Sequence, residues 1–160
     1  MDFRKLQWLF PIAVTLHSGE EAIWMPGWAL RHGAHLPLAP PDAAEARFAL
    51  VVLTVAAFAV TYLSARTGGN SIWAYLTFGY IVAMLANVFV PHVPATVVFR
   101  AYTPGVVTAV GINLPVMSLL VVRALRERWV SGRKAAAFAV AVPLALGGLI
   151  WLTFGIGRII

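Results

Sequence analysis

The chain has 160 residues, of which 61% are hydrophobic, 11% are charged and none is cysteine. Because soluble domains carry about 25% charged residues, this composition excludes an ordinary water-soluble globular domain, and the lack of cysteine excludes disulfides and thiolate metal sites. The net charge of +6 does not indicate nucleic-acid binding, since the twelve Lys and Arg lie mostly between apolar runs, where they set membrane orientation and contact lipid headgroups.

Five apolar runs follow one another along the chain, each close to the length of about 20 residues that a membrane-spanning helix needs. They extend over residues 6–25, 48–65, 72–91, 106–122 and 136–155. Backbone polar groups in lipid must be hydrogen-bonded within their own segment, so each run predicts a helix. The whole chain, 1–160, is therefore predicted to be a single all-α membrane domain, a bundle of about five transmembrane helices.

The first run is interrupted by three ionisable side chains, His17, Glu20 and Glu21. An ionised group near the bilayer centre costs about 2.5–3.5 kcal/mol on insertion scales, so such groups mark pairing, binding or catalysis. On a helix the two carboxylates lie one turn from the imidazole, at i,i+3 and i,i+4. Two carboxylates side by side in a low dielectric repel each other, which predicts a bound cation, or a proton held by one of them.

Residues 26–45 form the one long connection that the sequence predicts, and it contains four of the ten prolines. Long loops are often lids or binding loops, and a proline-rich linker is the alternative. His32 and His35 are spaced i,i+3 in this segment, which would allow metal ligation. Loop histidines are usually solvated, however, and we interpret these two in that way.

The charges between the runs predict the orientation of the chain. If the N-terminus is cytoplasmic, four cations fall on the outer side, Arg31, Arg47, Arg100 and Arg158. Eight fall on the cytoplasmic side, Arg4, Lys5, Arg66, Arg123, Arg126, Arg128, Arg133 and Lys134. The positive-inside rule therefore predicts a cytoplasmic N-terminus and an outer C-terminus, in a multi-pass protein of the cell (inner) membrane.

This orientation brings polar residues from three segments to the same half of the membrane. His17 lies beyond the midpoint of the first run, toward the outer side, because each helical residue rises about 1.5 Å. The third run ends there with Asn87 and His92, and the fourth begins there after Arg100 and Tyr102, with Asn113 about two turns deeper. The sequence therefore predicts one polar site in the outer half of the bundle.

The residues at these positions resemble a known family. His-Ser-Gly-Glu-Glu at 17–21 is similar to the defining motif of the HXXEE family, and Asn87 with His92 and Tyr-Thr-Pro-Gly at 102–105 resemble its accompanying Asn/His and Tyr-x-Pro-Gly motifs. The match extends from the first run into the fourth. Members are regarded as integral membrane enzymes whose reaction is not established, so the resemblance implies a membrane enzyme without supplying a substrate.

Our leading hypothesis from the residues is a divalent metal site, with zinc or iron as the ion. His17 and His92 with Glu20 or Glu21 would form a two-histidine, one-carboxylate set, which catalytic zinc uses in hydrolases and non-haem Fe(II) uses in oxygenases. The remaining glutamate would then be the general base. We favour hydrolysis over oxidation, with a lipid or a small apolar molecule as the substrate.

Other residues are candidates for binding the substrate. Tyr102 would orient the substrate or donate a proton, and Asn87, Arg100 and Asn113 would contact it. Each has a structural alternative: Asn87 as an interhelical hydrogen-bond partner, Arg100 as an interfacial cation. Asn87 is five residues before His92, so the two share a helical face only if Pro91 distorts the turn. For Pro104 and Gly105 we favour a turn and helix start.

Two different functions stay open beside the metal enzyme. In one, His17 and a glutamate shuttle protons in a metal-free isomerisation of an apolar substrate. In the other, the chain is not an enzyme but a lipid- or pigment-binding subunit of a larger membrane complex, or a small transporter. The chain could form a homo-oligomer under any of these hypotheses. If it is a subunit, the polar cluster joins helices by hydrogen bonds, and its mutation weakens assembly.

Overall fold

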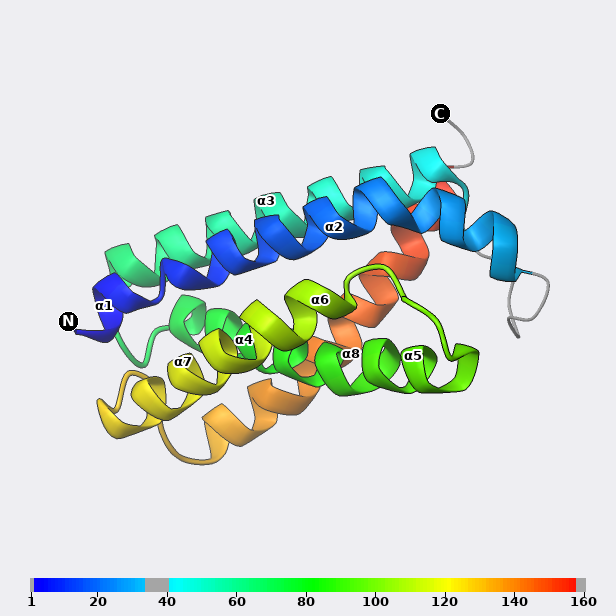
Figure 1. Cartoon of the computed structure of the whole chain (residues 1–160). Helices are drawn as coiled ribbons and strands as arrows, with labels where there is room; N and C mark the ends of the chain where they lie inside the picture. The colour runs from blue at the N-terminus through cyan, green and yellow to red at the C-terminus, as the bar shows by residue number, and fades with distance from the viewer. Residues whose placement is uncertain (1, 34–40, 158–160) are drawn as a thin grey trace.

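The computed structural model describes residues 2–33 and 41–157, and its described regular structure is helical (Figure 1). In chain order the elements are α1 (Phe3–Leu6), α2 (Leu9–His32), α3 (Ala43–Thr67), α4 (Ile72–Asn87), the π-helical segment η2 (Val88–His92), α5 (Val93–Phe99), α6 (Val106–Thr108), the π-helical segment η3 (Ala109–Asn113), α7 (Leu114–Arg126) and α8 (Gly132–Gly157).

The helices form a bundle in which α2 and α3 lie side by side, and α3 also packs on α4 and α8 (Figure 1). Four helical stretches in the described part of the chain are long and apolar enough to cross a membrane: Ala43–Thr67, Ile72–Phe99, Val106–Arg126 and Gly132–Ile150. The fifth long helix, α2, has 24 residues and carries the polar residues of the first run. The predicted all-α membrane bundle of about five helices is confirmed.

The helices are longer than the sequence predicted, and the connection at 26–45 is correspondingly shorter. The first helix continues through Pro26 to His32, so His32 belongs to a helix, whereas His35 lies outside the described residues. The next helix begins at Ala43 because Asp42 caps it: Oδ1 of Asp42 accepts from the N–H of Glu45 at 2.8 Å, and Oε2 of Glu45 accepts from the N–H of Asp42 at 3.0 Å. This reciprocal capping box fixes the start of α3.

The core forms where α4 packs on α3, α7 and α8, and where α2 packs on α3 and α7. Phe10 of α2 and Tyr80 of α4 make an edge-to-face contact with ring centroids 5.1 Å apart, and Met117 of α7 is fully buried. Gly79 sets the distance between α4 and α8, because a Cβ at this position would lie 2.5 Å from the carbonyl oxygen of Phe138. Small residues allow such close approach of membrane helices.

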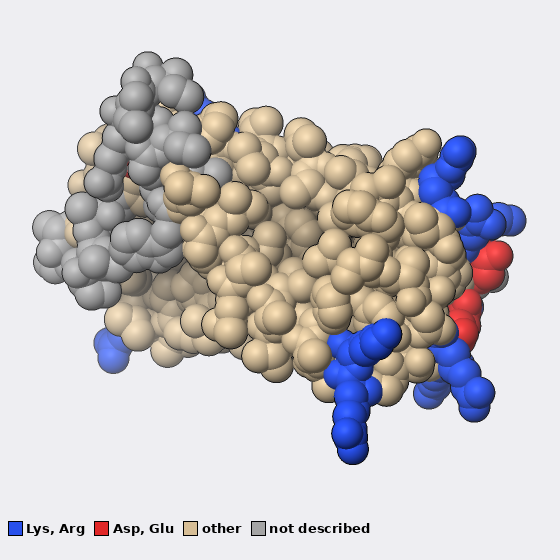
Figure 2. All heavy atoms as spheres, turned by 180° about the vertical axis from the view of Figure 1, so that it is seen from behind, with Lys and Arg blue, Asp and Glu red and all other residues tan. Residues whose placement is uncertain are grey.

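One end of the bundle gathers the N-terminus and two connections. The N–H of Phe3 donates to Oε2 of Glu127 at 2.7 Å, and the N–H of Asn70 donates to the carbonyl of Trp129 at 2.7 Å. Figure 2 shows Lys and Arg gathered mostly at one end, a few more of them at the other end, and a surface between the two ends that is mainly uncharged. The eight cations assigned above to the cytoplasmic side lie on or beside these segments.

Candidate functional site

Two histidines and a carboxylate meet where α2 passes η2. Nε2 of His17 lies 3.8 Å from Oε1 of Glu21, and Nε2 of His92 lies 3.5 Å from the same oxygen. His17 and His92 are almost fully buried, and their rings stand edge to face with centroids 4.8 Å apart. One ligand atom from each of the three residues lies within 4.8 Å of the others, so all three could bind one metal ion.

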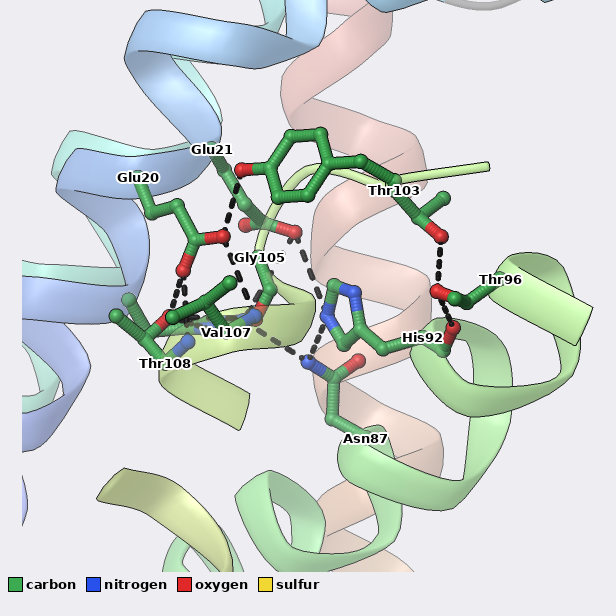
Figure 3. A network of polar contacts seen from close by, with 11 residues as sticks. Glu20, Glu21, Asn87, His92, Thr96, Thr103, Gly105, Val107 and Thr108 are labelled. Carbon is green, nitrogen blue, oxygen red and sulfur yellow. Dashed lines mark hydrogen bonds and ion pairs between the residues drawn. The ribbon is translucent and has the colours of Figure 1, made fainter. Parts of the chain in front are cut away.

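A kink in the third span places His92 in this cluster. Val90 leaves the helical conformation (φ −149°, ψ 112°) just before Pro91, and proline is the common cause of a sharp helix kink. Because of the kink, Nδ2 of Asn87 lies 2.9 Å from Nε2 of His92, and it also lies 3.2 Å from Nε2 of His17 (Figure 3). The condition set by the sequence, a turn distorted at Pro91, is met.

A hydrogen bond on the far side of the His17 ring fixes which of its nitrogens carries the proton. Oγ1 of Thr108 donates to Glu20 at 2.6 Å and lies 2.9 Å from Nδ1 of His17. A hydroxyl that donates its proton elsewhere must accept from the ring, so Nδ1 of His17 is protonated and Nε2 is a lone pair. The Nε2 lone pair of His17 therefore points to the cluster.

Glu20 faces away from the metal-ligand cluster although it is adjacent to Glu21 in the sequence. Its carboxylate accepts from the hydroxyl of Tyr102 at 2.6 Å and, at 2.8 Å and 3.3 Å, from the backbone N–H groups of Thr108 and Val107. With the Thr108 hydroxyl this makes four donors (Figure 3). Glu20 therefore fastens the start of the fourth span to α2, and Glu21 is the carboxylate available for ligation.

Gly105 allows the chain to pass directly over the two histidines. A Cβ at this position would lie 2.6 Å from Cε1 of His92, 2.8 Å from Cε1 of His17 and 3.0 Å from Cγ of Glu21. Its φ of +87° is also a conformation that glycine adopts at no steric cost. The turn predicted for this segment is present, and its glycine is required by the site.

Two threonines hold the same segment in place from the other side. Oγ1 of Thr103 is hydrogen-bonded to Oγ1 of Thr96, which in turn donates to the carbonyl of His92 at 2.9 Å (Figure 3). The segment that follows α5 is thus connected through side chains to the turn that carries the second histidine.

The structure brings six of the eight candidate residues together: His17, Glu20, Glu21, Asn87, His92 and Tyr102. It leaves two apart. Arg100 is exposed at the end of α5, and Asn113 is fully buried with both side-chain polar atoms unpartnered among the described residues. Thr108, which connects Glu20 to His17, was not predicted as a site residue. A single threonine in an apolar run does not by itself indicate a functional role.

A cavity of about 500 Å³ adjoins the cluster. His17, Glu21 and Asn87 form part of its wall, and the rest comes mostly from apolar side chains of α2, α3, α4 and α8. A separate surface hollow on the other side of α2 is lined by Glu20, Trp24, Arg31, Tyr102, Val107 and Thr108. The two adjacent glutamates thus face different spaces, and only Glu21 faces the apolar cavity.

Comparison with known proteins agrees with the motifs. A family model described as "Protein of unknown function with HXXEE motif" matches residues 8–120, a range that contains every residue of the cluster. The "Uncharacterized protein YrkK" of Bacillus subtilis (strain 168) is 30% identical over 148 residues, which make up 92% of this chain and 92% of the relative. No solved structure matches. The chain belongs to the HXXEE family.

Proposed function

We propose that this protein is a metal-dependent membrane enzyme in which His17, Glu21 and His92 hold a zinc or iron ion. The observation that carries the proposal is the convergence of their three ligand atoms within 4.8 Å, in a buried site beside an apolar cavity. Two imidazoles and one carboxylate form the protein ligand set of catalytic zinc sites, which leave a coordination position open.

The surroundings of the histidines suit ligation. Metal-binding histidines usually donate their second ring N–H to a hydrogen-bond acceptor, which fixes the tautomer and the ring orientation. Here Thr108 accepts from Nδ1 of His17. The side-chain amide of Asn87 donates to Nε2 of both histidines. If the amide rotated by 180°, its Oδ1 would face the cluster and could bind a cation instead.

The reaction that we favour is hydrolysis of a lipid or a small apolar substrate. A bound divalent metal supplies Lewis acidity and a lowered pKa of its water. Hydrolysis needs only water as a second reactant, whereas oxidation would also need dioxygen and an electron donor. The cavity beside Glu21 supports an apolar substrate. Glu20 already accepts four hydrogen bonds, so we assign it to positioning Thr108 and Tyr102 rather than to proton abstraction.

Metal content tests the proposal directly. Protein purified without a histidine tag is measured by elemental mass spectrometry, as wild type and as His17→Ala, Glu21→Gln and His92→Ala. We expect about one zinc or iron per chain in the wild type and its loss from each variant, with the helical circular dichroism retained. His32→Ala is the matched control, because His32 packs on the rings of Trp28 and Phe99 away from the cluster. A wild type that stays metal-free after incubation with zinc or ferrous iron would contradict the proposal.

One observation favours a second candidate, metal-free proton transfer. Hydrogen bonds run without interruption from Tyr102 through Glu20 and Thr108 to His17, and such a chain could move protons toward the cavity. This isomerase-type mechanism predicts that activity survives chelation, whereas the metal enzyme loses it. If the variants instead lose only their association with partner proteins, the chain is a binding subunit.

A further inference from the structure

Resting on the proposed function, we infer that the cavity holds an alkyl chain of a lipid, with an uncharged oxygen function of that lipid against His17 and Glu21. The shape of the cavity, the distribution of its polar atoms and its lack of cationic side chains each support one part of this inference.

The cavity is elongated along α2. On α2 its lining residues extend from Val14 to Met25, and eleven residues at about 1.5 Å each correspond to ~16 Å of helix. Its volume of about 500 Å³ lies within the range of about 300–1,000 Å³ that is usual for ligand sites. The length and the volume suit an extended alkyl chain.

The polar atoms available to a ligand are confined to one part of the wall. Tyr80 also lines the cavity, but its hydroxyl donates to the carbonyl of Leu53 at 2.9 Å. Ser18 accepts from Thr54 at 3.1 Å and keeps its own hydroxyl proton. Among the lining side chains, hydrogen-bonding capacity toward the cavity therefore remains at Ser18 and Glu21, beside His17, and the rest of the wall is suited to hydrocarbon.

The charge of the lining decides between a neutral and an anionic ligand. Among the lining side chains that the structure describes, none is Lys or Arg, and the only carboxylate is that of Glu21. Without the metal ion, an anionic headgroup would therefore have no cation to pair with and would lie beside a carboxylate, which is unfavourable in a buried site. An ester, alcohol or similar oxygen function meets neither difficulty.

Adjacent glycines on α8 supply a test and its control. A Cβ added to Gly147 or to Gly148 would meet nothing within 4 Å, so both positions have room for a side chain. Only Gly147 lines the cavity, whereas Gly148 is exposed. Gly147→Leu should therefore fill part of the cavity, and Gly148→Leu should add the same side chain outside it. Neither residue belongs to the metal-ligand cluster.

The experiment uses 1-hexadecanol that carries a photoreactive diazirine and an alkyne, with hexadecanoic acid bearing the same groups as the anionic comparison. Full-length protein in lipid nanodiscs is irradiated with each probe, and labelled peptides are located by mass spectrometry. We expect the alcohol to label cavity-lining segments of α3, α4 and α8 and, in protein stripped of metal with a chelator, to outcompete the acid. Gly147→Leu should weaken this labelling about tenfold, the effect of losing the burial of roughly two methylene groups, and Gly148→Leu should leave it unchanged.

Metal content is measured on the same preparations, so that the two proposals fail separately. Labelling that is equal in Gly147→Leu and wild type overturns the cavity assignment even when metal is bound. Preferential labelling of the metal-free protein by the acid overturns the uncharged headgroup. A metal-free wild type whose cavity is nevertheless labelled overturns the proposed metal enzyme and leaves the lipid site standing.

Discussion

Asn87 and His92 are five residues apart, and yet Nδ2 of Asn87 lies 2.9 Å from Nε2 of His92. On a regular α-helix five residues would separate the two side chains by about 140° around the axis, since each residue turns by about 100°. The break at Val90 and Pro91 removes that separation. Nδ2 of Asn87 also lies 3.2 Å from Nε2 of His17. Asn87 therefore contacts both candidate histidine ligands, which come from two different helical segments, α2 and η2.

This position makes Asn87→Asp a test of the metal site. A carboxylate between two Nε2 atoms adds a fourth ligand of the kind that zinc binds, so we expect zinc to bind about tenfold more tightly or better. Without zinc the variant buries an extra unpaired charge, and its melting temperature in detergent should fall below that of the wild type. Zinc titration with and without chelator measures both effects.

Asn113→Asp is the matched control, since Asn113 is also fully buried but is not part of the cluster. Relative to the wild type, it should be destabilised by the same amount in the presence and absence of zinc, because its own metal site is intact. The ligand assignment would be contradicted if zinc raised the melting temperature of Asn113→Asp more than that of the wild type, or raised that of Asn87→Asp no more than that of the wild type.

Gly105→Ala should weaken the site, whereas Asn87→Asp should strengthen its metal binding. The left-handed backbone alone costs a residue with a Cβ about 1–2 kcal/mol, and the methyl group would also push against His17 and His92. We expect a lower melting temperature and a loss of metal. Gly19→Ala is the comparison, because a Cβ there meets nothing within 4 Å and alanine favours a helix interior by up to about 1 kcal/mol. Equal melting temperatures for the two variants would refute this account of Gly105.

Much of the fold could be predicted from the sequence, because apolar runs in lipid have few alternatives to the helix. The spacing of His17 and Glu21 also predicts their approach, since i,i+4 neighbours share a face of any regular helix. Helix ends were harder to predict: Pro26 lies inside α2 instead of ending it.

The remaining features of the site depend on tertiary structure. Which of Glu20 and Glu21 faces the histidines is decided by the rotation of α2 about its axis, and that rotation is set by packing on α3. The proximity of Asn87 to His92 depends on the size of a kink, which periodicity does not encode. Thr108 became part of the site only when the fourth span was placed beside α2.

Thr108→Val tests whether that threonine orients His17. Valine keeps the shape of the side chain but cannot accept from Nδ1, so the imidazole loses its fixed tautomer. Removal of such an outer-shell partner typically costs 10- to 100-fold in metal affinity, and we expect about that loss. Thr108→Ser should restore binding because it restores the hydroxyl. If both variants bind zinc like the wild type, Thr108 has no positioning role.

The end of the bundle near the N-terminus should respond to acid. Glu127 is exposed and lies outside the spans, and its pKa is held below the ordinary value because the N–H of Phe3 donates to it and Arg123 also donates. A pKa that is lower in the folded state means that the unfolded chain binds more protons. The stabilisation is therefore complete above the unfolded value of about 4.3 and is lost as the pH falls through the folded value.

Comparison of wild type with Glu127→Gln isolates this contribution. The wild type should melt at a higher temperature at pH 7, and the difference should shrink as the pH falls below about 4.3. Hydrogen exchange at the amide of Phe3 should be faster in the variant at pH 7, because its acceptor is weakened. A difference in melting temperature that stays constant over this pH range would contradict the role of the Glu127 charge.

The orientation of the chain can be measured with single cysteines, because the natural sequence contains none. Ser131 is exposed at the cation-rich end, and Ala44 is exposed at the start of α3, which runs from the opposite end of the bundle. The positive-inside rule places the cation-rich end in the cytoplasm. A membrane-impermeant maleimide should therefore label Ala44→Cys in intact cells and Ser131→Cys only after permeabilisation. The predicted pattern would place the His17 cluster in the outer half of the membrane. The reverse pattern would place it in the cytoplasmic half, where its metal would come from the cytosolic pool.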